Sequence, residues 1–304
     1  MRVVSIGECM VEMALTQGGA AQIRFAGDTF NTAAYMSRLG LEVDYVTALG
    51  KDDPFSDGIL GRMAEEGVGA SLITQVPGRL PGLYAIERDD AGERRFFYWR
   101  GEAAVRDLFA VCDVAALGAA LNGAALVYLS GITLAVIGEA GRAKMTELLA
   151  KARAAGAAIA FDTNYRPRLW SGPQSARQAI EAVAPYATFL SASEEDLAEL
   201  YDEGPAATVS RWAAGGAEVI ARSPGTGLAV HSPGGVFEAP PHDPVRAVDA
   251  TGAGDSFNAA YLAARLRGVS PSEAVAAGRG LAQVVVQHLG AIIPAAAMPD
   301  LPLF

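Results

Sequence analysis

Strand-like and helix-like segments alternate along most of this chain, and that order constrains the fold more than any other feature. Helical periodicity is present at Asn31–Leu39 and Glu139–Ala155, each followed by a glycine, and a capping box at Ser270 and Glu273 starts another helix. Short apolar runs typical of buried strands lie at Arg2–Gly7, Val43–Leu49, Ala125–Leu129, Ala157–Phe161, Phe189–Ser191 and Val219–Ala221. The alternation predicts an α/β fold with a mostly parallel central sheet flanked by helices.

One segment interrupts the alternation. Gly82–Arg88 and Glu93–Arg100 are two strand-like runs on either side of Asp89-Asp90-Ala91-Gly92, which is the pattern of a β-hairpin. In the second run, Phe96, Tyr98 and Arg100 share one face, whereas Phe97 and Trp99 share the other. Such an aromatic hairpin is typical of a flap over a site, and an edge hairpin that covers the core fits the pattern equally well.

Composition excludes several classes of protein. The 304 residues carry a net charge of −10 without a block of Lys or Arg, which argues against a nucleic-acid-binding surface. The two cysteines, Cys9 and Cys112, have no metal-ligand spacing, so we expect reduced thiols and a cytoplasmic location. The uncharged stretch from Val114 to Gly138 is broken by glycines and predicts a small helix, a strand and a loop in the core instead of a membrane span. We expect one domain over residues 1–304.

The most informative stretch runs from Val248 to Asn258 and reads VDATGAGDSFN. Gly252 and Gly254 allow a tight turn with exposed N–H groups, and the apolar spacing that follows predicts a helix that begins there. A glycine turn that opens a helix is a site for anions. Asp255 would repel a phosphate there unless it has a task, such as accepting the proton of an attacking hydroxyl; a helix-start aspartate is the simpler alternative.

This run resembles the carboxyl-terminal signature of the PfkB, or ribokinase-like, carbohydrate kinases, with Ala250 where threonine is frequent. The amino-terminal signature of the family is matched by AGDTFNTA at residues 26–33, with Gly40 and Gly50 at the expected intervals. Further strings, such as FYWR at residues 97–100 and NYRPRLW at residues 164–170, are similar to the 2-keto-3-deoxygluconate kinases of this family. The resemblance covers essentially the whole chain and implies a ribokinase-like fold with a small β lid, formed by residues of about 10–26 and 80–102.

The resemblance also implies the parts of a kinase site. Asp255 is expected to be the general base, while Gly252, Ala253 and Gly254 donate backbone N–H groups to the transferred phosphoryl group. ATP is expected along Arg222–Gly227, with Gly225 and Gly227 close to the nucleotide and Thr251 beside the glycine turn, although an ordinary β-turn fits the loop equally well. Mg²⁺ is expected with ATP. The residues SEED at 193–196 depart from the family's Asn-X-X-Glu motif, and Asp196, or Glu195, is the candidate for the metal-linked role. A solvated, negatively charged first turn of a helix fits these residues equally well.

Two arginines point to the substrate class. Arg166 follows a strand end of the parallel sheet, and Arg100 lies on the flap with Tyr98. Either arginine alone is more typical of a surface charge, but a guanidinium binds a carboxylate in two-point geometry, and the pair suits a site for a sugar acid. The tyrosines near them include Tyr84, and Gly27, Asp28 and Asn31 are expected to hold the sugar hydroxyls. The expected reaction is phosphorylation of the 6-hydroxyl of 2-keto-3-deoxygluconate, and we expect a homo-oligomer that binds neither nucleic acid nor membrane.

Three other functions fit the sequence less well. A kinase for a neutral sugar, such as fructose or ribose, would leave Arg100 and Arg166 without an obvious partner. A regulator on the same fold that has lost catalysis does not explain Asp255 within an intact glycine turn. A dehydrogenase is disfavoured, because no Gly-X-Gly-X-X-Gly follows the first strand.

Overall fold

The computed structural model describes residues 1–15, 20–88, 94–223, 227–241 and 245–301. Within these residues the main sheet has nine strands, in the order β15-β14-β13-β12-β11-β10-β1-β4-β6. Neighbouring strands from β13 to β6 are parallel, whereas β14 and β15 are antiparallel to the strands beside them. Their bounds are β1 Arg2–Ile6, β4 Glu42–Val46, β6 Val68–Gly69, β10 Leu126–Ser130, β11 Ala158–Asp162, β12 Phe189–Ser193, β13 Glu218–Arg222, β14 Leu228–Ser232 and β15 Gly235–Glu238.

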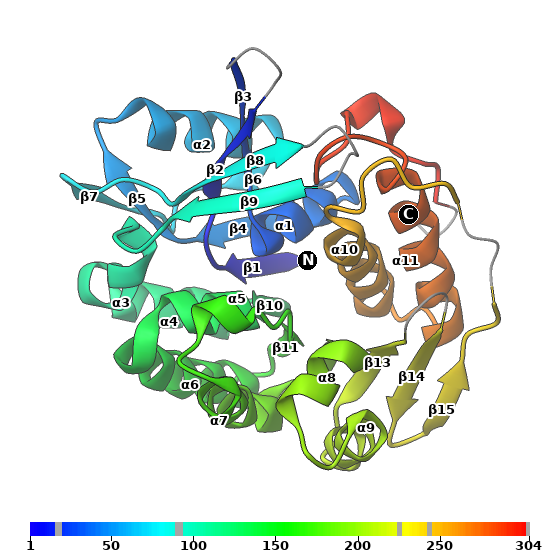
Figure 1. Cartoon of the computed structure of the whole chain (residues 1–304). Coiled ribbons are helices and arrows are strands. Elements are labelled where there is room, and N and C mark those ends of the chain that lie inside the picture. Colours follow the sequence, from blue (N-terminus) through cyan, green and yellow to red (C-terminus); the bar gives the residue numbers. More distant parts are fainter. Residues whose placement is uncertain (16–19, 89–93, 224–226, 242–244, 302–304) are drawn as a thin grey trace.

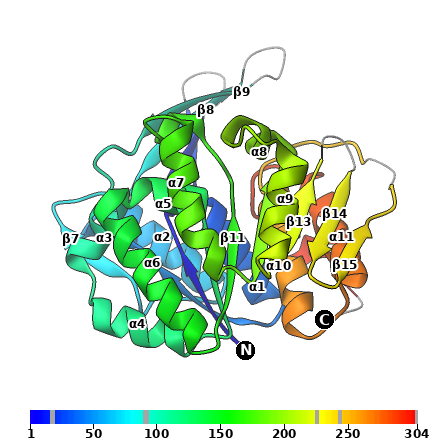
Figure 2. The same ribbon diagram turned by 90° about the horizontal axis from the view of Figure 1, so that it is seen from below.

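Helices cover both faces of this sheet (Figures 1 and 2). One face packs against α1 (Asp28–Arg38), α2 (Pro54–Glu65), α10 (Ala253–Leu266) and α11 (Pro271–Val285). The other packs against α3 (Leu108–Val111), α4 (Val114–Asn122), α5 (Gly131–Val136), α6 (Gly138–Ala154), α7 (Pro173–Val183), α8 (Glu194–Leu200) and α9 (Pro205–Ala214). Because successive strand residues face opposite ways, Val3 belongs to the first core and Val4 to the second. This fold is the α/β architecture that the sequence predicts.

A second sheet stands at one end of the body, where β8 and β9 lie at the upper edge in Figure 2. Its strand order is β3-β2-β8-β9, with bounds β2 Met10–Leu15, β3 Ala21–Ala26, β8 Leu83–Arg88 and β9 Arg94–Trp99. Strands β8 and β9 pair antiparallel, as the sequence predicts, although residues 89–93 of the expected turn lie outside the described residues. The two segments expected to form a lid therefore combine into one small sheet.

Some element boundaries differ from the prediction. The run Val43–Leu49 is not one strand: the chain leaves the main sheet after β4, and β5 (Ala48–Lys51) pairs instead with β7 (Thr74–Pro77). Helix α1 starts three residues before Asn31, at Asp28, whose carboxylate suits the positive end of the helix dipole. The loop expected after the strand near Leu129 is helix α5, which a Ser130–Thr133 capping box begins.

The remaining short elements are the 3₁₀ turns η1 (Ala104–Asp107), η2 (Pro167–Leu169), η3 (Ala184–Tyr186) and η4 (Ala295–Ala297). A search of the described residues for a helix with both the length and the apolar character of a membrane span found none. The strand order reverses between β1 and β10, because the chain builds outward from β1 in both directions. Ligands of open α/β sheets bind outside the carboxyl ends of the strands at such a point.

Candidate active site

The glycine turn begins α10 as the sequence predicts. Gly252 is the residue that precedes the helix, with a φ of +80°. A Cβ atom at Gly252 would lie 2.5 Å from the carbonyl oxygen of Ala291, so both the backbone conformation and the packing require glycine. At Gly254, by contrast, a Cβ atom would meet only the Arg222 guanidinium at 3.7 Å within the described residues. The space over Gly254 is therefore open to a ligand.

Backbone donors point out of this turn. Ala253, Gly254 and Asp255 are the first three helical residues, and the N–H groups of a first turn have no partner within the helix. The Ala253 N–H donates to the carbonyl of Ala250 at 3.3 Å, so this donor already has a partner within the turn. The N–H groups of Gly254 and Asp255 are the better-placed donors.

Asp255 is half-buried at the start of α10. Its Oδ2 accepts a 2.8 Å hydrogen bond from Asn31 Nδ2 on α1, which joins the two helices at the site. Burial raises the pKa of Asp255 to about 8, and the nearby Asp28 and Asp162 carboxylates act in the same direction. The Asn31 hydrogen bond and the Arg166 charge oppose this shift. A carboxyl that titrates near neutral pH is suited to proton transfer.

The amino-terminal end of α1 supplies the other predicted sugar-binding groups. Gly27 precedes this helix, and a Cβ atom there would lie 2.0 Å from the carbonyl oxygen of Glu8, so only glycine fits. The Asp28 carboxylate accepts a 2.8 Å hydrogen bond from Asn164 Nδ2. Asn164 itself has a φ of +30°, a conformation that asparagine tolerates better than most residues. The strand ends β1 and β11 thus meet at the start of α1.

A cluster of polar side chains from α10 and three neighbouring strands holds Arg222 in place. Asn258 Nδ2 donates to Asp162 Oδ2 at 2.8 Å, and burial raises the pKa of Asp162 whereas the Arg222 charge lowers it. Arg222 donates to Ser191 at 2.8 Å and forms a 3.3 Å ion pair with Asp162. These contacts hold the Arg222 guanidinium beside Gly254, at the edge where the nucleotide is expected.

The two predicted carboxylate readers differ in their surroundings. Arg166 is exposed, donates to the carbonyl of Tyr165 at 2.9 Å, and lies close enough to Asp255 to lower its pKa. Arg100 lies one residue past β9 and is buried in an ion pair with Glu8. The Asp28 charge raises the pKa of both Glu8, the partner of Arg100, and Asp255, whose pKa Arg166 lowers. Asp28 therefore lies near the groups that both arginines act on.

The tyrosines of the small sheet form a row on one face. Tyr84 is buried, and its hydroxyl donates to Glu12 Oε2 at 2.5 Å. Tyr98 is 46% exposed, and its ring centroid lies 5.9 Å from that of Tyr84. Tyr98 is therefore better placed than Tyr84 to reach a ligand through its hydroxyl.

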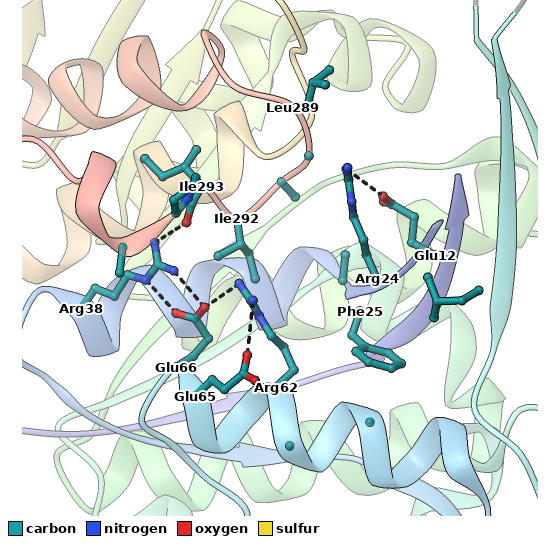
Figure 3. A pocket seen from close by; sticks show the side chains of 18 residues that line it. Glu12, Arg24, Phe25, Arg38, Arg62, Glu65, Glu66, Leu289, Ile292 and Ile293 are labelled. Atoms are coloured by element: carbon teal, nitrogen blue, oxygen red, sulfur yellow. Dashed lines mark hydrogen bonds and ion pairs between the residues drawn. The ribbon is translucent and has the colours of Figure 1, made fainter. Parts of the chain in front are cut away.

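Residues 290–291 of the carboxyl-terminal segment pack against the glycine turn. Asp249 accepts hydrogen bonds from the N–H groups of Thr251 (2.9 Å) and Gly290 (3.1 Å), and the Tyr35 hydroxyl donates to the Ala291 carbonyl at 2.7 Å. The far side of this segment lines a cavity of about 880 Å³ between β3 and α2 (Figure 3). There Arg38 and Arg62 both bind Glu66, and Arg38 also donates to the Ile293 carbonyl. This cavity is separate from the glycine turn.

Of the residues predicted to bind the nucleotide and the metal, the structure describes Gly227 and Asp196 but not Gly225. Gly225 lies outside the described residues, and the Gly227 carbonyl accepts a 2.9 Å hydrogen bond from Ser223 N within the β13–β14 connection. Asp196 Oδ2 already accepts hydrogen bonds from Thr163 Oγ1 and Tyr165 N. No group of three or more metal-ligating side chains occurs in the described ranges. Mg²⁺ bound with ATP needs few protein ligands, so this donor set fits a metal that arrives on the nucleotide.

Sequence reasoning assigned no role to four residues that the structure places in or around the site. They are Glu8, Asp162, Asn164 and Asn258. Asp162 and Asn164 had a usable signal, because polar residues at the carboxyl end of a buried parallel strand face the ligand edge of the sheet. Nothing in the sequence pairs Glu8 with a residue 92 positions away.

Known proteins resemble this chain over nearly its whole length. The family model described as pfkB family carbohydrate kinase matches residues 1–298. A 2-dehydro-3-deoxygluconokinase of Dickeya dadantii is 42% identical over 97% of this chain and 97% of its own length. The Escherichia coli K12 protein of the same description is 39% identical over 98% and 99%.

Solved structures show the same fold. A fructokinase of Xylella fastidiosa, crystallised with bound ATP, superimposes with a TM-score of 0.84 at 23% identity. The match covers 99% of this chain and 96% of that one. This chain therefore shares its fold with that protein over nearly the whole length of both.

Proposed function

Because the chain belongs to the pfkB family of carbohydrate kinases, we propose that it transfers the γ-phosphoryl group of ATP to the 6-hydroxyl of 2-keto-3-deoxygluconate. The products are 2-keto-3-deoxy-6-phosphogluconate and ADP. The names of two relatives at 42% and 39% identity, 2-dehydro-3-deoxygluconokinase, support this substrate, which is the same compound under another name. Both alignments cover at least 97% of this chain and of the relative.

The observation that carries the proposal is the position of Asp255. Its carboxylate lies at the opening of an anion-binding turn and is held by Asn31, which belongs to the helix expected to bind the sugar. Asp255 takes the proton of the sugar hydroxyl as the hydroxyl oxygen bonds to the γ-phosphorus, while the bond from that phosphorus to the bridging oxygen of ADP breaks. With a pKa of about 8 in the free protein, Asp255 can hold that proton and release it later.

Charge on the transferred group is stabilised by the turn. The N–H groups of Gly254 and Asp255 and the positive end of the α10 dipole point toward the open space over Gly254. Arg222, held by Asp162 and Ser191, adds a fixed positive charge beside it. Mg²⁺ carried by ATP would supply further positive charge to the phosphate oxygens. Roles for Asp196 in metal binding and for Thr251, Gly225 and Gly227 in nucleotide binding belong to the same proposal.

The acid group of the substrate is assigned to Arg166 and Arg100, and its hydroxyls to Gly27, Asp28 and Asn31. Arg166 is exposed beside Asp255, which suits a side chain that meets an incoming carboxylate. A kinase for a neutral sugar such as fructose is the second candidate, because the Arg100 charge already has a partner in Glu8 and such a sugar would need no further donor from it. The small sheet, with Tyr84 and Tyr98, is assigned the role of a lid over the sugar.

The assembly and the location of the protein are part of the same proposal. Phe97 and Trp99, on the face of β9 away from Tyr98, are 38% and 63% exposed, which supports burial of that face against a second copy. Cys9 and Cys112 are both free thiols, which fits a cytoplasmic protein. Sedimentation of the purified protein would show a homo-oligomer, and a Trp99→Lys variant would shift it toward the monomer.

An ADP-release assay over sugars and sugar acids tests the substrate. The expected result is that 2-keto-3-deoxygluconate gives the highest kcat/KM in the panel, with turnover that requires Mg²⁺. If fructose or ribose is used better, the substrate assignment is wrong and the neutral-sugar kinase replaces it. If no compound releases ADP above the background, the proposed reaction fails altogether.

A further inference from the structure

Glu8 and Arg100 form a buried ion pair where the small sheet joins the body. Glu8 lies in the connection from β1 of the main sheet to β2 of the small sheet, and Arg100 follows β9, the last strand of that sheet. Their side chains are only 2% and 10% exposed. The pair therefore links the segment that enters the small sheet with the segment that leaves it.

Two glycines bring the other connections to the same point. Gly27 lies between β3 and α1, and a Cβ atom on it would be 2.0 Å from the Glu8 carbonyl oxygen. Gly82 precedes β8, and a Cβ atom on it would be 2.4 Å from Glu8 Oε1 and 3.2 Å from Arg100 Cβ. All four chain segments between the body and the small sheet thus contact Glu8 or the pair that it forms.

The pair leaves hydrogen-bonding capacity unused. Arg100 Nη2 donates to Glu8 Oε2, whereas Arg100 Nε and Glu8 Oε1 are buried without a partner among the residues that the structure describes. A guanidinium has five donor hydrogens in a fixed plane, so a second acceptor can bind beside the first. A buried ion pair is weak evidence for stability, because apolar residues of the same volume often serve as well. A role in ligand binding explains the Glu8–Arg100 pair better than a role in stability does.

We propose that Glu8 is a positioning residue, which holds the Arg100 guanidinium in the orientation that meets the carboxylate of the sugar acid. The inference rests on the proposed function, since it assumes that the substrate carries an acid group. Glu8 fixes a long side chain before the substrate arrives, so that binding does not have to order it. Because Glu8 sits where the small sheet joins the body, it also ties the position of Arg100 to the position of the sheet above the sugar.

The test is a double-mutant cycle on purified protein. Glu8→Gln keeps an acceptor oxygen but removes the charge, and we expect it to raise the KM for 2-keto-3-deoxygluconate by about 5- to 30-fold, the scale of ordering one long side chain. The kcat and the KM for ATP should stay within about threefold. In an Arg100→Ala background, Glu8→Gln should change the KM by less than about twofold, because a positioning residue acts only through the group that it holds.

A matched control separates positioning from folding. Arg38 and Glu66 form an ion pair of similar burial, 11% and 5% exposed, beside the cavity of Figure 3. Because Glu66 also pairs with Arg62, Glu66→Gln should lower the Tm at least as much as Glu8→Gln does, without changing the ratio of kcat/KM between the acid and an analogue that lacks the carboxylate. If Glu8→Gln does not fold, Glu8→Asp takes its place, with a smaller rise in the same KM.

Different results overturn the two proposals. An unchanged or lower KM for the acid in the folded Glu8 variant, or an equal effect in the presence and absence of Arg100, overturns the role of Glu8. A wild-type protein that prefers the analogue without a carboxylate overturns the proposed substrate instead. The wild-type ratio and the mutant cycle are measured independently, so the two failures are distinguishable.

Discussion

Asp255 combines two requirements that oppose each other. A general base must be able to lose its proton, yet desolvation of the half-buried carboxyl, together with the negative charges of Asp28 and Asp162, raises its pKa to about 8. Because the folded state binds the proton more tightly than the unfolded chain does, this group costs stability as the pH rises from about 4 toward 8. The ionised Asp255 carboxylate thus lowers the stability of the folded protein at the position where the reaction needs a base.

An Asp255→Asn variant tests both sides of that conflict. Loss of the base should lower kcat by roughly 10²–10⁴-fold, while the affinity for an ATP analogue stays nearly the same. The neutral amide avoids the cost of desolvating a charge, so the Tm at pH 8 should rise, by about 1–2 °C for each kcal/mol gained in a chain of this length. Steady-state kinetics and calorimetry measure the two effects. A turnover within a few-fold of the wild type rules out Asp255 as the base.

The pH dependence of the wild-type reaction follows from the same pKa. The deprotonated carboxylate is the active form, so kcat/KM should rise with pH and level off above a pKa of about 8. Asp28→Asn removes a neighbouring negative charge and should move the rise to lower pH, whatever it does to the absolute rate. A profile that is flat from pH 6 to 9 contradicts the assignment of the base.

At the scale of elements, two glycines of one turn have different reasons to be glycine. Gly252 has a φ of +80° and touches Ala291 of the carboxyl-terminal segment, which Asp249 and Tyr35 hold in place. Gly254 has ordinary helical surroundings and open space above it. The first glycine thus shapes the turn, and the second leaves room for the phosphoryl group.

Alanine substitutions should separate these reasons. Gly252→Ala strains the backbone and collides with Ala291, so we expect a loss of about 2 kcal/mol or more of folding free energy. Gly254→Ala should change stability by less than about 1 kcal/mol, because alanine suits a helix, yet lower kcat by at least tenfold as its methyl group occupies the phosphoryl site. Urea denaturation and the ADP assay give the two readouts. Equal stability losses in both variants would contradict the distinction.

The small sheet is the element whose motion can be tested. Tyr98 and Trp99 of β9 are exposed, and β8 and β9 reach the body through the Gly82 and Arg100 connections. If the sheet closes over the sugar, hydrogen exchange in β8 and β9 should slow when the substrate and a non-hydrolysable ATP analogue are both bound. The buried strands β10 and β11 serve as the reference, since their exchange should not change. Equal protection with and without ligands indicates a static edge of the fold.

At the scale of the whole molecule, the sequence predicted what depends on local patterns. Apolar periodicity predicted the parallel sheet, and the glycine turn predicted the start of α10. It did not separate β4 from β5, because both are apolar and only their pairing partners differ. The Glu8–Arg100 pair and the Asn31–Asp255 hydrogen bond join residues far apart in the chain, and no local pattern specifies which distant side chains meet.

The two substrates should bind to separable halves of the molecule. The proposed sugar side is built from α1, the small sheet and the end of β11, and the proposed nucleotide side from β12, β13 and the Arg222 region; they meet at the turn that carries Asp255. A ligand present at 100 times its Kd stabilises the folded state by about 2.7 kcal/mol, so each substrate should raise the Tm measurably by itself.

Arg166→Ala removes an exposed side chain whose hydrogen bond among the described residues goes to the Tyr165 carbonyl, and the variant should fold normally. It should lose the Tm shift caused by the sugar acid, with kcat/KM for the acid falling roughly 10- to 150-fold, the value of a charge-assisted hydrogen bond, while the shift caused by the ATP analogue stays. Lysine at position 166 should restore part of the loss, because it keeps the charge without the two-point geometry. If both Tm shifts disappear together, the halves are not independent and Arg166 holds the site as a whole.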